Sequence, residues 1–354
     1  MKTKLINLKF VFLAWLMTGW LWGLAGQVET AEKTVIHYTS VHEGQKIIID
    51  NDYGRIEVQP VNRPHILIIA TIRLMHPQEK DLDKAFDQVA PVFEKTDSHT
   101  LYIHSKQQGD KNLAGPGPGT YTISYVIQMP ETVAMEVRAD YGSLKVEKMQ
   151  APLTCQMDYG QITAGRLENP DNYIQGDYLD SLYIDFMRGG KISGDYARVH
   201  IRFAFDLHLT GDYNHLRFNH LKKLRIQGDH NRMQIHRVKS IRSIGDYSHI
   251  DIDRLYDGYF QGDLNTLRIG ELMDGAYRLE FIGDYTKAEI HNPFDIPFRL
   301  QLRGKFNLRS DLPLHILQDR QAGDERTLKA YYKRSDASYF IKGLGEHYTV
   351  ELKK

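Results

Sequence analysis

The chain has 354 residues, enough for one or two ordinary domains or for one long array of repeats. Its 45 basic residues balance its 45 acidic residues, so the overall charge favours neither nucleic acid nor an anionic membrane as a partner. A single cysteine, Cys155, excludes an intramolecular disulfide, so the burial of apolar surface has to stabilise the fold.

Residues 1–25 have the pattern of a signal peptide. Three lysines make the start basic, residues 10–24 form an apolar run, and Gly23 and Ala25 place small residues at the two positions that a signal peptidase reads. This pattern predicts cleavage after Ala25, and the alternative is an uncleaved N-terminal anchor. In either case we expect export, to the periplasm, the outer cell surface or the medium. No later segment is apolar enough to span a bilayer, so we expect no membrane span in the mature chain.

Residues 26–130 are expected to form a β-rich N-terminal cap with one helix. A strand, a turn at Asp52-Tyr53-Gly54 and a second strand follow one another in residues 46–58, and residues 65–75 are another strand candidate. Residues 81–95 carry apolar side chains at helical spacing, which predicts a helix that Pro91 kinks or ends.

Residues 131–293 contain a recurring turn, in which an aspartate is usually followed by a tyrosine. Consecutive aspartates are 17 to 21 residues apart, most often 17 or 18, and a fixed period of this length indicates a stacked repeat architecture. The turn aspartates are Asp140, Asp158, Asp177, Asp195, Asp212, Asp229, Asp246, Asp263 and Asp284.

Apolar residues recur at fixed distances from each aspartate, for example Leu216 and Phe218 at four and six residues after Asp212. Each repeat therefore has two short strands with alternating inward residues, and one repeat alone has too little core to be stable. We predict an all-β fold, a single-stranded β-solenoid with about 17–18 residues per rung, because stacked rungs bury a continuous apolar column.

The turn itself predicts a structural role for its residues. Each turn carries one glycine, after the tyrosine in early copies such as Gly160 and before the aspartate in later ones such as Gly228. A tight corner needs one residue with positive φ, which glycine adopts freely. The aspartate is expected to bond the amides of its own turn.

Residues 294–354 lose the period but keep strand-like segments, among them residues 298–302, 327–332 and 348–352. A solenoid needs its open end covered so that its edge does not pair with other chains. We therefore expect this region to be a C-terminal β cap.

The chain resembles a group of bacterial proteins. Its export signal, its Asp52-Tyr53-Gly54 opening, the strand that ends in Gln128-Met129-Pro130 and its Asp140-Tyr141-Gly142 repeats are similar to the "putative adhesin" β-strand-repeat families of unknown function, which are related to auto-transporter adhesin heads. The resemblance covers most of the mature chain. It implies an envelope or surface location, and it implies no catalytic residues.

Two columns of the predicted solenoid have alternative interpretations. Stacked carboxylates repel one another unless they are solvated, hydrogen-bonded or bridged by a cation, so the aspartate column is either a turn device or a calcium site. The stacked tyrosines either stiffen one corner or offer a strip for sugar stacking. The histidines are scattered over different columns, so we predict no metal site and no cofactor.

The middle repeats are rich in outward cations, which suit an anionic glycan, although an ordinary solvated surface has the same composition. The predicted contact residues are Arg198, His200, His215, Arg217, Arg225, Arg232, Tyr196 and Tyr213.

The sequence lacks the nucleophile elbow and the phosphate-binding loop, so no catalytic residue is predicted. We expect an exported, non-catalytic binding or scaffold protein of the envelope, whose partner is an anionic glycan or another envelope protein, and no nucleic acid. The alternatives are a polysaccharide-active β-helix enzyme and an envelope sensor or assembly partner.

Overall fold

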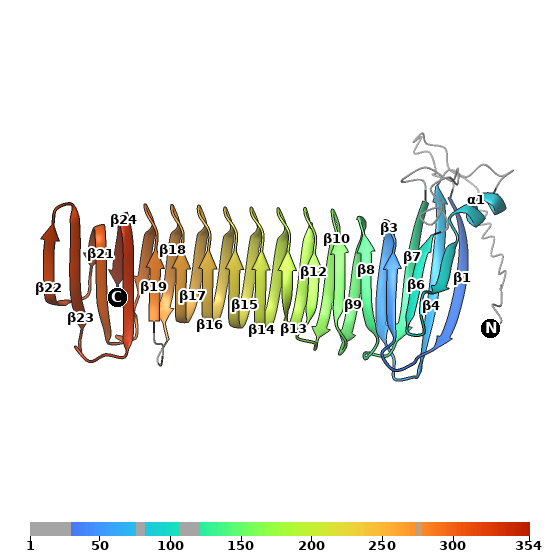
Figure 1. Ribbon diagram of the computed structural model, residues 1–354, viewed down its shortest axis with the longest axis horizontal. Helices are drawn as coiled ribbons and strands as arrows, with labels where there is room; N and C mark the ends of the chain where they lie inside the picture. The colour runs from blue at the N-terminus through green and yellow to red at the C-terminus, as the bar shows by residue number, and fades with distance from the viewer. Residues whose placement is uncertain (1–29, 76–81, 106–120, 274, 276–277) are drawn as a thin grey trace, which may run out of the picture. The chain divides into compact units, whose positions relative to one another are not determined.

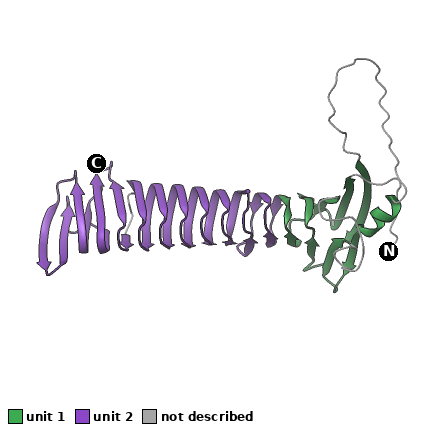
Figure 2. Ribbon diagram, turned by 90° about the horizontal axis from the view of Figure 1, so that it is seen from above, with its two compact units in different colours: residues 1–145 green, residues 146–354 purple. Residues whose placement is uncertain are grey.

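The computed structural model describes residues 30–75, 82–105, 121–273, 275 and 278–354, and the predicted signal peptide lies outside them. The described chain is almost entirely β-strand, with one helix in the N-terminal region, as predicted (Figure 1). It divides into two compact units, residues 1–145 and 146–354 (Figure 2).

Unit 1 combines parallel and antiparallel strands. The strand β2 pairs in parallel with both β6 and β8, and β3 pairs in parallel with β7. The long strands β1 and β4 are antiparallel to each other, and β4 is antiparallel to β7. Its elements are β1 (Thr30–Ser40), β2 (Lys46–Asp50), β3 (Tyr53–Pro60), β4 (His65–Met75), α1 (Leu82–Gln88), β5 (Pro91–Lys95), β6 (Thr100–Ser105), β7 (Tyr121–Met129), β8 (Ala134–Ala139) and β9 (Tyr141–Met149), the last crossing into residues 146–149.

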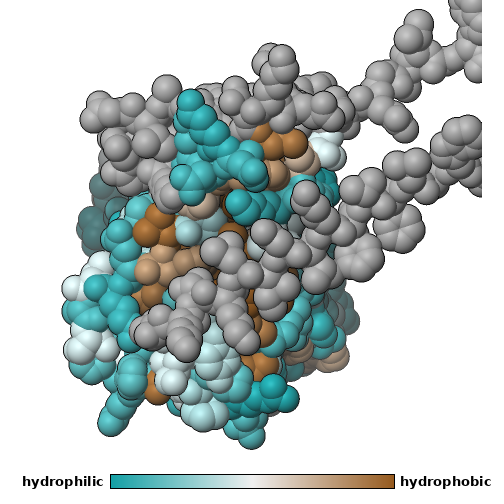
Figure 3. All heavy atoms as spheres, turned by 90° about the vertical axis from the view of Figure 1, so that its right-hand side faces the viewer, coloured by the Kyte–Doolittle hydropathy of each residue, from teal (hydrophilic) through white to brown (hydrophobic). Residues whose placement is uncertain are grey.

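The core of unit 1 comes from alternate residues of these strands. Ile47, Ile49, Ile66 and Ile68 are fully buried. Seen from its right-hand side in Figure 3, the unit shows hydrophobic residues near the middle of the face and hydrophilic residues around them. The turn at Asp52 is an early copy of the repeat turn, as predicted, because the Tyr141 amide donates to the Asp52 carbonyl and the rings of Tyr53 and Tyr141 stack.

The predicted helix of residues 81–95 is wrong in its second half. The helix α1 ends at Gln88, and Pro91–Lys95 is the strand β5, which pairs antiparallel with β6. Proline has no amide hydrogen to donate and disfavours helix in the residue before it. Residues 91–95 instead form their backbone hydrogen bonds with the edge of β6. Strand pairing therefore decides the structure here, although the spacing of the apolar residues favours a helix.

Unit 2 is a row of rungs followed by a hairpin (Figure 1). Its strands are β10 (Leu153–Met157), β11 (Gln161–Leu167), β12 (Asn172–Gln175), β13 (Ser181–Ser193), β14 (Arg198–Thr210), β15 (His215–Gln227), β16 (Arg232–Ile244), β17 (His249–Gln261), β18 (Thr266–Leu272), β19 (Arg278–Ile282), β20 (Lys287–His291), β21 (Phe298–Ser310), β22 (His315–Ala322), β23 (Glu325–Tyr332) and β24 (Tyr339–Lys353).

The rungs stack in parallel and in register, which confirms the β-solenoid. Along β14 and β15, each residue lies beside the residue 17 positions further on, as Leu209 lies beside Ile226. The inward residues of β14 are Val199, Ile201, Ala204, Leu207 and Leu209, all at most 3% exposed. Inward residues alternate along a straight strand, but Ile201, Ala204 and Leu207 are three residues apart, so the strand bends on either side of Ala204. Each rung therefore has a first face before the bends, a bent segment, and a second face after them.

Cys155 belongs to this core, as its inward position predicts. It is fully buried and lies beside Ile174 of the next rung. Burial raises the pKa of the Cys155 thiol to about 12, so the thiol stays protonated and packs as a small apolar side chain.

Residues 294–354 contain one more rung, which the lost period concealed. The strand β24 pairs in parallel with β19 and β20, and its Gly345-Glu346-His347 continues the column of turns. The Glu346 amide donates to Asp284 Oδ1 at 2.6 Å, and the His347 ring stacks on Tyr285. Because this rung is reached only after β21, β22 and β23, its distance from Asp284 breaks the repeat period.

The last strands of unit 2 extend the sheet beyond β24. The strand β21 stacks in parallel on β24, and β23 and β22 follow as antiparallel strands. The strand β22 has an irregular register at Ile316 and Gln318 and is exposed on both sides. A bulge of this kind and charges such as Arg320 protect an edge strand against further pairing.

Candidate binding surface of the middle rungs

The turns place the tyrosines, rather than the glycines, in the left-handed helical conformation. Tyr178, Tyr196 and Tyr213 have φ between 54° and 57°. Positive φ is confirmed for later glycines such as Gly211 and Gly228, at 138° and 147°, but not for all of them. The shared requirement is space, because a Cβ at Gly228 would lie 2.1 Å from the carbonyl oxygen of Gly211 in the preceding rung.

The turn aspartates bond the next rung, which corrects the expectation that they bond their own turns. Asp195 Oδ1 accepts a hydrogen bond of 2.7 Å from the Asp212 amide, and Asp212 Oδ1 accepts one of 2.7 Å from the Asp229 amide. The same bond recurs from Asp158 to Asp284 at 2.7 to 2.9 Å. The aspartates therefore act as a structural ladder that holds successive turns in register.

The tyrosines of the turns form a stacked ladder. Tyr178, Tyr196 and Tyr213 stack with ring centroids 4.9 to 5.0 Å apart and nearly parallel planes. His230 continues the stack between Tyr213 and Tyr247. Neighbouring rings cover each other's faces, so the predicted contact residues Tyr196 and Tyr213 offer a ligand their edges and hydroxyl groups.

The first face of the middle rungs carries most of the predicted contact residues. Arg198, His215 and Arg232 lie in one column, each beside the next. His200 and Arg217 lie side by side in the neighbouring column of the same face. The structure thus brings these five residues together.

Arg225 lies apart from that group, on the second face. It stands between His208 and Arg242 in register, and its guanidinium donates to Asp206 Oδ1 at 2.9 Å. The eight predicted contact residues therefore belong to three places in the solenoid, namely the turn, the first face and the second face.

The column that contains Arg225 has a feature that the sequence-based prediction missed. It consists of Tyr173, Lys191, His208, Arg225, Arg242 and Tyr259, each beside the next in the parallel register. We call it the tyrosine-capped cationic column. Four residues of the column, His208, Arg225, Arg242 and Tyr259, each lie 13 residues after the aspartate of their turn. An alignment of the outward positions of the repeats would therefore have found most of the column.

Each end of the tyrosine-capped cationic column has the same arrangement. Lys191 Nζ lies 5.9 Å from the centre of the Tyr173 ring, and the Arg242 guanidinium lies 4.5 Å from that of Tyr259. The two tyrosine hydroxyls hydrogen-bond the side chains of Gln175 and Gln261 at 2.7 and 2.8 Å. Cation–π contacts and hydrogen bonds of this kind hold the side chains in place.

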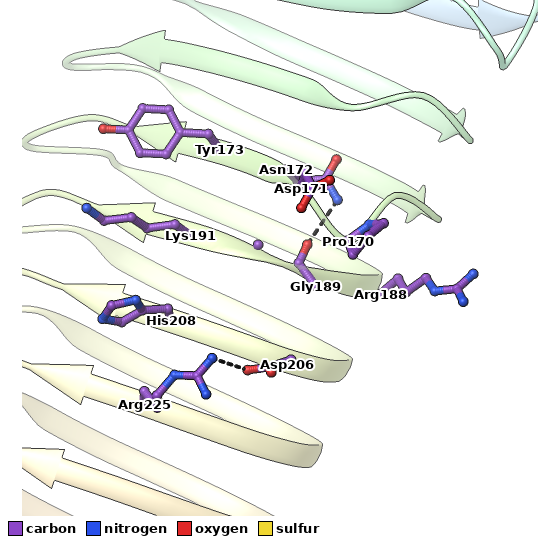
Figure 4. Close-up of a pocket in the computed structure, with 11 residues that line it drawn as sticks. Pro170, Asp171, Asn172, Tyr173, Arg188, Gly189, Lys191, Asp206, His208 and Arg225 are labelled. Carbon is purple, nitrogen blue, oxygen red and sulfur yellow. Dashed lines mark hydrogen bonds and ion pairs between the residues drawn. The ribbon is translucent and has the colours of Figure 1, made fainter.

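Two shallow hollows border this column. The first, of about 450 Å³, is lined by Tyr173, Arg188, Lys191, His208 and Arg225 among others (Figure 4). The second, of about 390 Å³, includes Lys223, Arg225, Arg242 and Tyr259. Figure 4 shows Lys191, His208 and Arg225 above one another, with Asp206 beside Arg225.

The second face has more positive than negative charge. Among the described residues, Asp206 pairs with Arg225 and lies 3.9 Å from Lys223, whereas Lys191 and Arg242 form no ion pair. These two cations therefore carry charge that a bound anion would neutralise.

His208 should make stability on the second face depend on pH. Burial, then the nearby Arg225 and Lys191, lowers the pKa of His208, although Asp206 opposes them. The unfolded chain then binds a proton at a higher pH than the folded chain does, so stability falls as the pH falls below about 6.5. We expect His208→Gln to lose less stability than the parent between pH 7 and pH 5, measured by urea unfolding. An equal loss in both proteins would contradict this assignment.

No group of three or more His, Cys, Asp or Glu residues within the described part of the chain is arranged to hold a metal ion. In the same part of the chain, no helix has the length and apolarity needed to cross a membrane.

No protein-family model and no curated protein matches the chain. Among solved structures, a "putative adhesin" from Parabacteroides distasonis is 10% identical, with 90% of this chain and 97% of that chain covered and a TM-score of 0.37. A "putative adhesin" from Parabacteroides merdae is 9% identical, with 91% and 97% covered and a TM-score of 0.33. A "putative lipid binding protein" from Parabacteroides distasonis is 10% identical, with 93% and 98% covered and a TM-score of 0.31. These values describe a loose similarity.

Proposed function

We propose that the chain is an exported, non-catalytic β-solenoid that binds an anionic glycan at the cell envelope. The observation that carries this proposal is the tyrosine-capped cationic column, in which Lys191 and Arg242 have no ion-pair partner among the described residues. Export rests on the signal-like pattern of residues 1–25, and the adhesin-like role agrees with the resemblance of the repeats to "putative adhesin" families.

The regularity of the rungs supports binding to a repeating ligand. Successive residues of the column are separated by the spacing of neighbouring strands, about 4.8 Å, and they project from a parallel sheet. Arg225 and Arg242 are one such spacing apart, and Lys191 and Arg225 are two spacings apart with His208 between them. The backbone of such a sheet is already ordered before a ligand binds, so the entropy cost of binding is confined to the side chains. A polymer with regularly placed negative charges fits such a surface better than a single small anion does.

A glycan array probed with the purified chain tests this function. Binding to acidic glycans that weakens with added salt, without release of products, is the expected result. Release of shortened glycans would identify a polysaccharide-active enzyme instead. No binding and no cleavage would overturn the proposal and favour an assembly partner that works through protein contacts.

Matched variants locate the contact surface. We expect Lys191→Gln with Arg242→Gln to weaken binding about tenfold, since each exposed charge contributes about 1 kcal/mol or less. Arg198→Gln with Arg232→Gln removes the same number of charges from the first face and serves as the control. If only this second pair weakens binding, the contact surface is the first face, which carries five of the eight contact residues predicted from the sequence.

A further inference from the structure

The tyrosine-capped cationic column on the second face has a hydrogen-bonded tyrosine–glutamine pair at each of its two ends. Tyr173 and Gln175 form one hydrogen-bonded pair, and Tyr259 and Gln261 form the other. In both pairs the glutamine lies two residues after the tyrosine and points outward on the same strand. Between the pairs, Gln175 is followed in its column by Ser193, Thr210, Gln227 and Ile244 before Gln261. None of these intervening residues stands beside a tyrosine.

Each Tyr–Gln pair keeps polar groups available to a ligand. The tyrosine hydroxyl uses its hydrogen on the glutamine oxygen, so its lone pairs and the glutamine amide hydrogens stay unused within the described structure. Such groups suit the hydroxyls of a sugar. The cations between the two pairs suit acidic groups. The column therefore offers hydrogen-bonding groups for sugar hydroxyls at its two ends and positive charge for acidic groups between them.

We propose that the tyrosine-capped cationic column is a bounded site for a linear acidic polysaccharide, which lies along the stack of rungs and has one sugar at each Tyr–Gln pair. This inference rests on the proposed function. The acidic groups of the sugar chain lie over Lys191, Arg225 and Arg242. From Tyr173 to Tyr259 the register advances by five rungs, which corresponds to about 24 Å.

The same geometry argues against a single-stranded nucleic acid. Proteins that bind single strands usually stack bases on open aromatic faces. Here Lys191 and Arg242 each lie over a tyrosine ring of the column, and the ring faces of the turn tyrosines cover one another.

Binding of acidic oligosaccharides of increasing length, measured by calorimetry on the full chain, tests the site. Affinity is expected to rise with each added sugar until the oligomer spans about 24 Å, and then to stay constant. Gln175→Ala with Gln261→Ala should weaken binding of spanning oligomers about fivefold, and shorter oligomers, which reach at most one of the two pairs, by less. Gln227→Ala, in the same column without a neighbouring tyrosine, is the matched control and should leave the affinity of spanning oligomers unchanged.

The outcomes separate the two proposals. Suppose that acidic oligomers bind and that Lys191→Gln with Arg242→Gln weakens their binding. If no plateau occurs, or if Gln175→Ala with Gln261→Ala leaves the affinity of spanning oligomers unchanged, the bounded site is wrong and the proposed function stands. If no acidic oligomer binds, both are wrong. A single-stranded oligonucleotide of equal length that binds as tightly would overturn the assignment to a polysaccharide.

Discussion

Replacing Gly228 by alanine is expected to lower the free energy of unfolding by about 3 kcal/mol. The new Cβ would lie 2.1 Å from the Gly211 oxygen and 2.7 Å from its carbonyl carbon, and both atoms belong to backbone that cannot rotate away. The φ of 147° at Gly228 is also one that residues other than glycine rarely adopt. The rung has to shift, which strains the hydrogen bond from the Asp229 amide to Asp212. Urea unfolding measures the loss.

A second glycine provides the control for Gly228→Ala. Gly323, in the turn between β22 and β23, has a positive φ of 63°, and a Cβ there would meet no atom within 4 Å. Gly323→Ala therefore carries only the cost of a left-handed conformation, about 1 kcal/mol. Equal losses for the two variants would show that the close approach between successive turns is not what requires glycine.

Hydrogen exchange adds a spatial test of the same variant. Each rung of a solenoid contacts only its neighbours, so a defect at one turn destabilises nearby rungs first. In Gly228→Ala we expect faster amide exchange in β15 and β16, which flank the substituted turn, than in β13, which is more distant from it in the stack.

The sequence predicts the solenoid well because the same spacing recurs in many residues. Leu216, Phe218 and Ile226 repeat inward positions of their neighbours, and all are at most 3% exposed. Parallel stacking in register follows from this repetition, since any other register would expose the apolar residues. The predicted helix is longer than α1 because the spacing of apolar residues within 81–95 contains no information about β6, which follows that segment and pairs with its second half.

The candidate site was predicted less completely, for two physical reasons. Outward residues are under no common packing constraint, so Lys191, His208 and Tyr259 differ in type although they occupy corresponding positions of their rungs. Two residues near in sequence, Arg217 and Arg225, also lie on different faces because the strand bends between them at Leu221. A charge cluster in the sequence is therefore distributed over separate surfaces, whereas residues 17 apart become neighbours.

The aspartate ladder allows hydrogen bonding to be separated from charge. Asp212→Ala leaves the partly buried Asp229 amide without its acceptor, and we expect a loss of about 2 kcal/mol. Asp212→Asn retains an Oδ1 acceptor and removes one carboxylate from a column in which like charges are about 4.8 Å apart. Its stability should therefore lie within about 0.5 kcal/mol of the parent or slightly above it.

Calcium addition completes this test, because the calcium interpretation predicts the opposite order. A hard cation held by the column needs the negative charge of its carboxylates, so Asp212→Asn would then lose about as much stability as Asp212→Ala. Calcium would also raise the melting temperature of the parent by more than that of Asp212→Asn. If instead the asparagine variant unfolds like the parent with and without calcium, the aspartates serve as acceptors for the next rung, and binding is left to the outward residues between the turns.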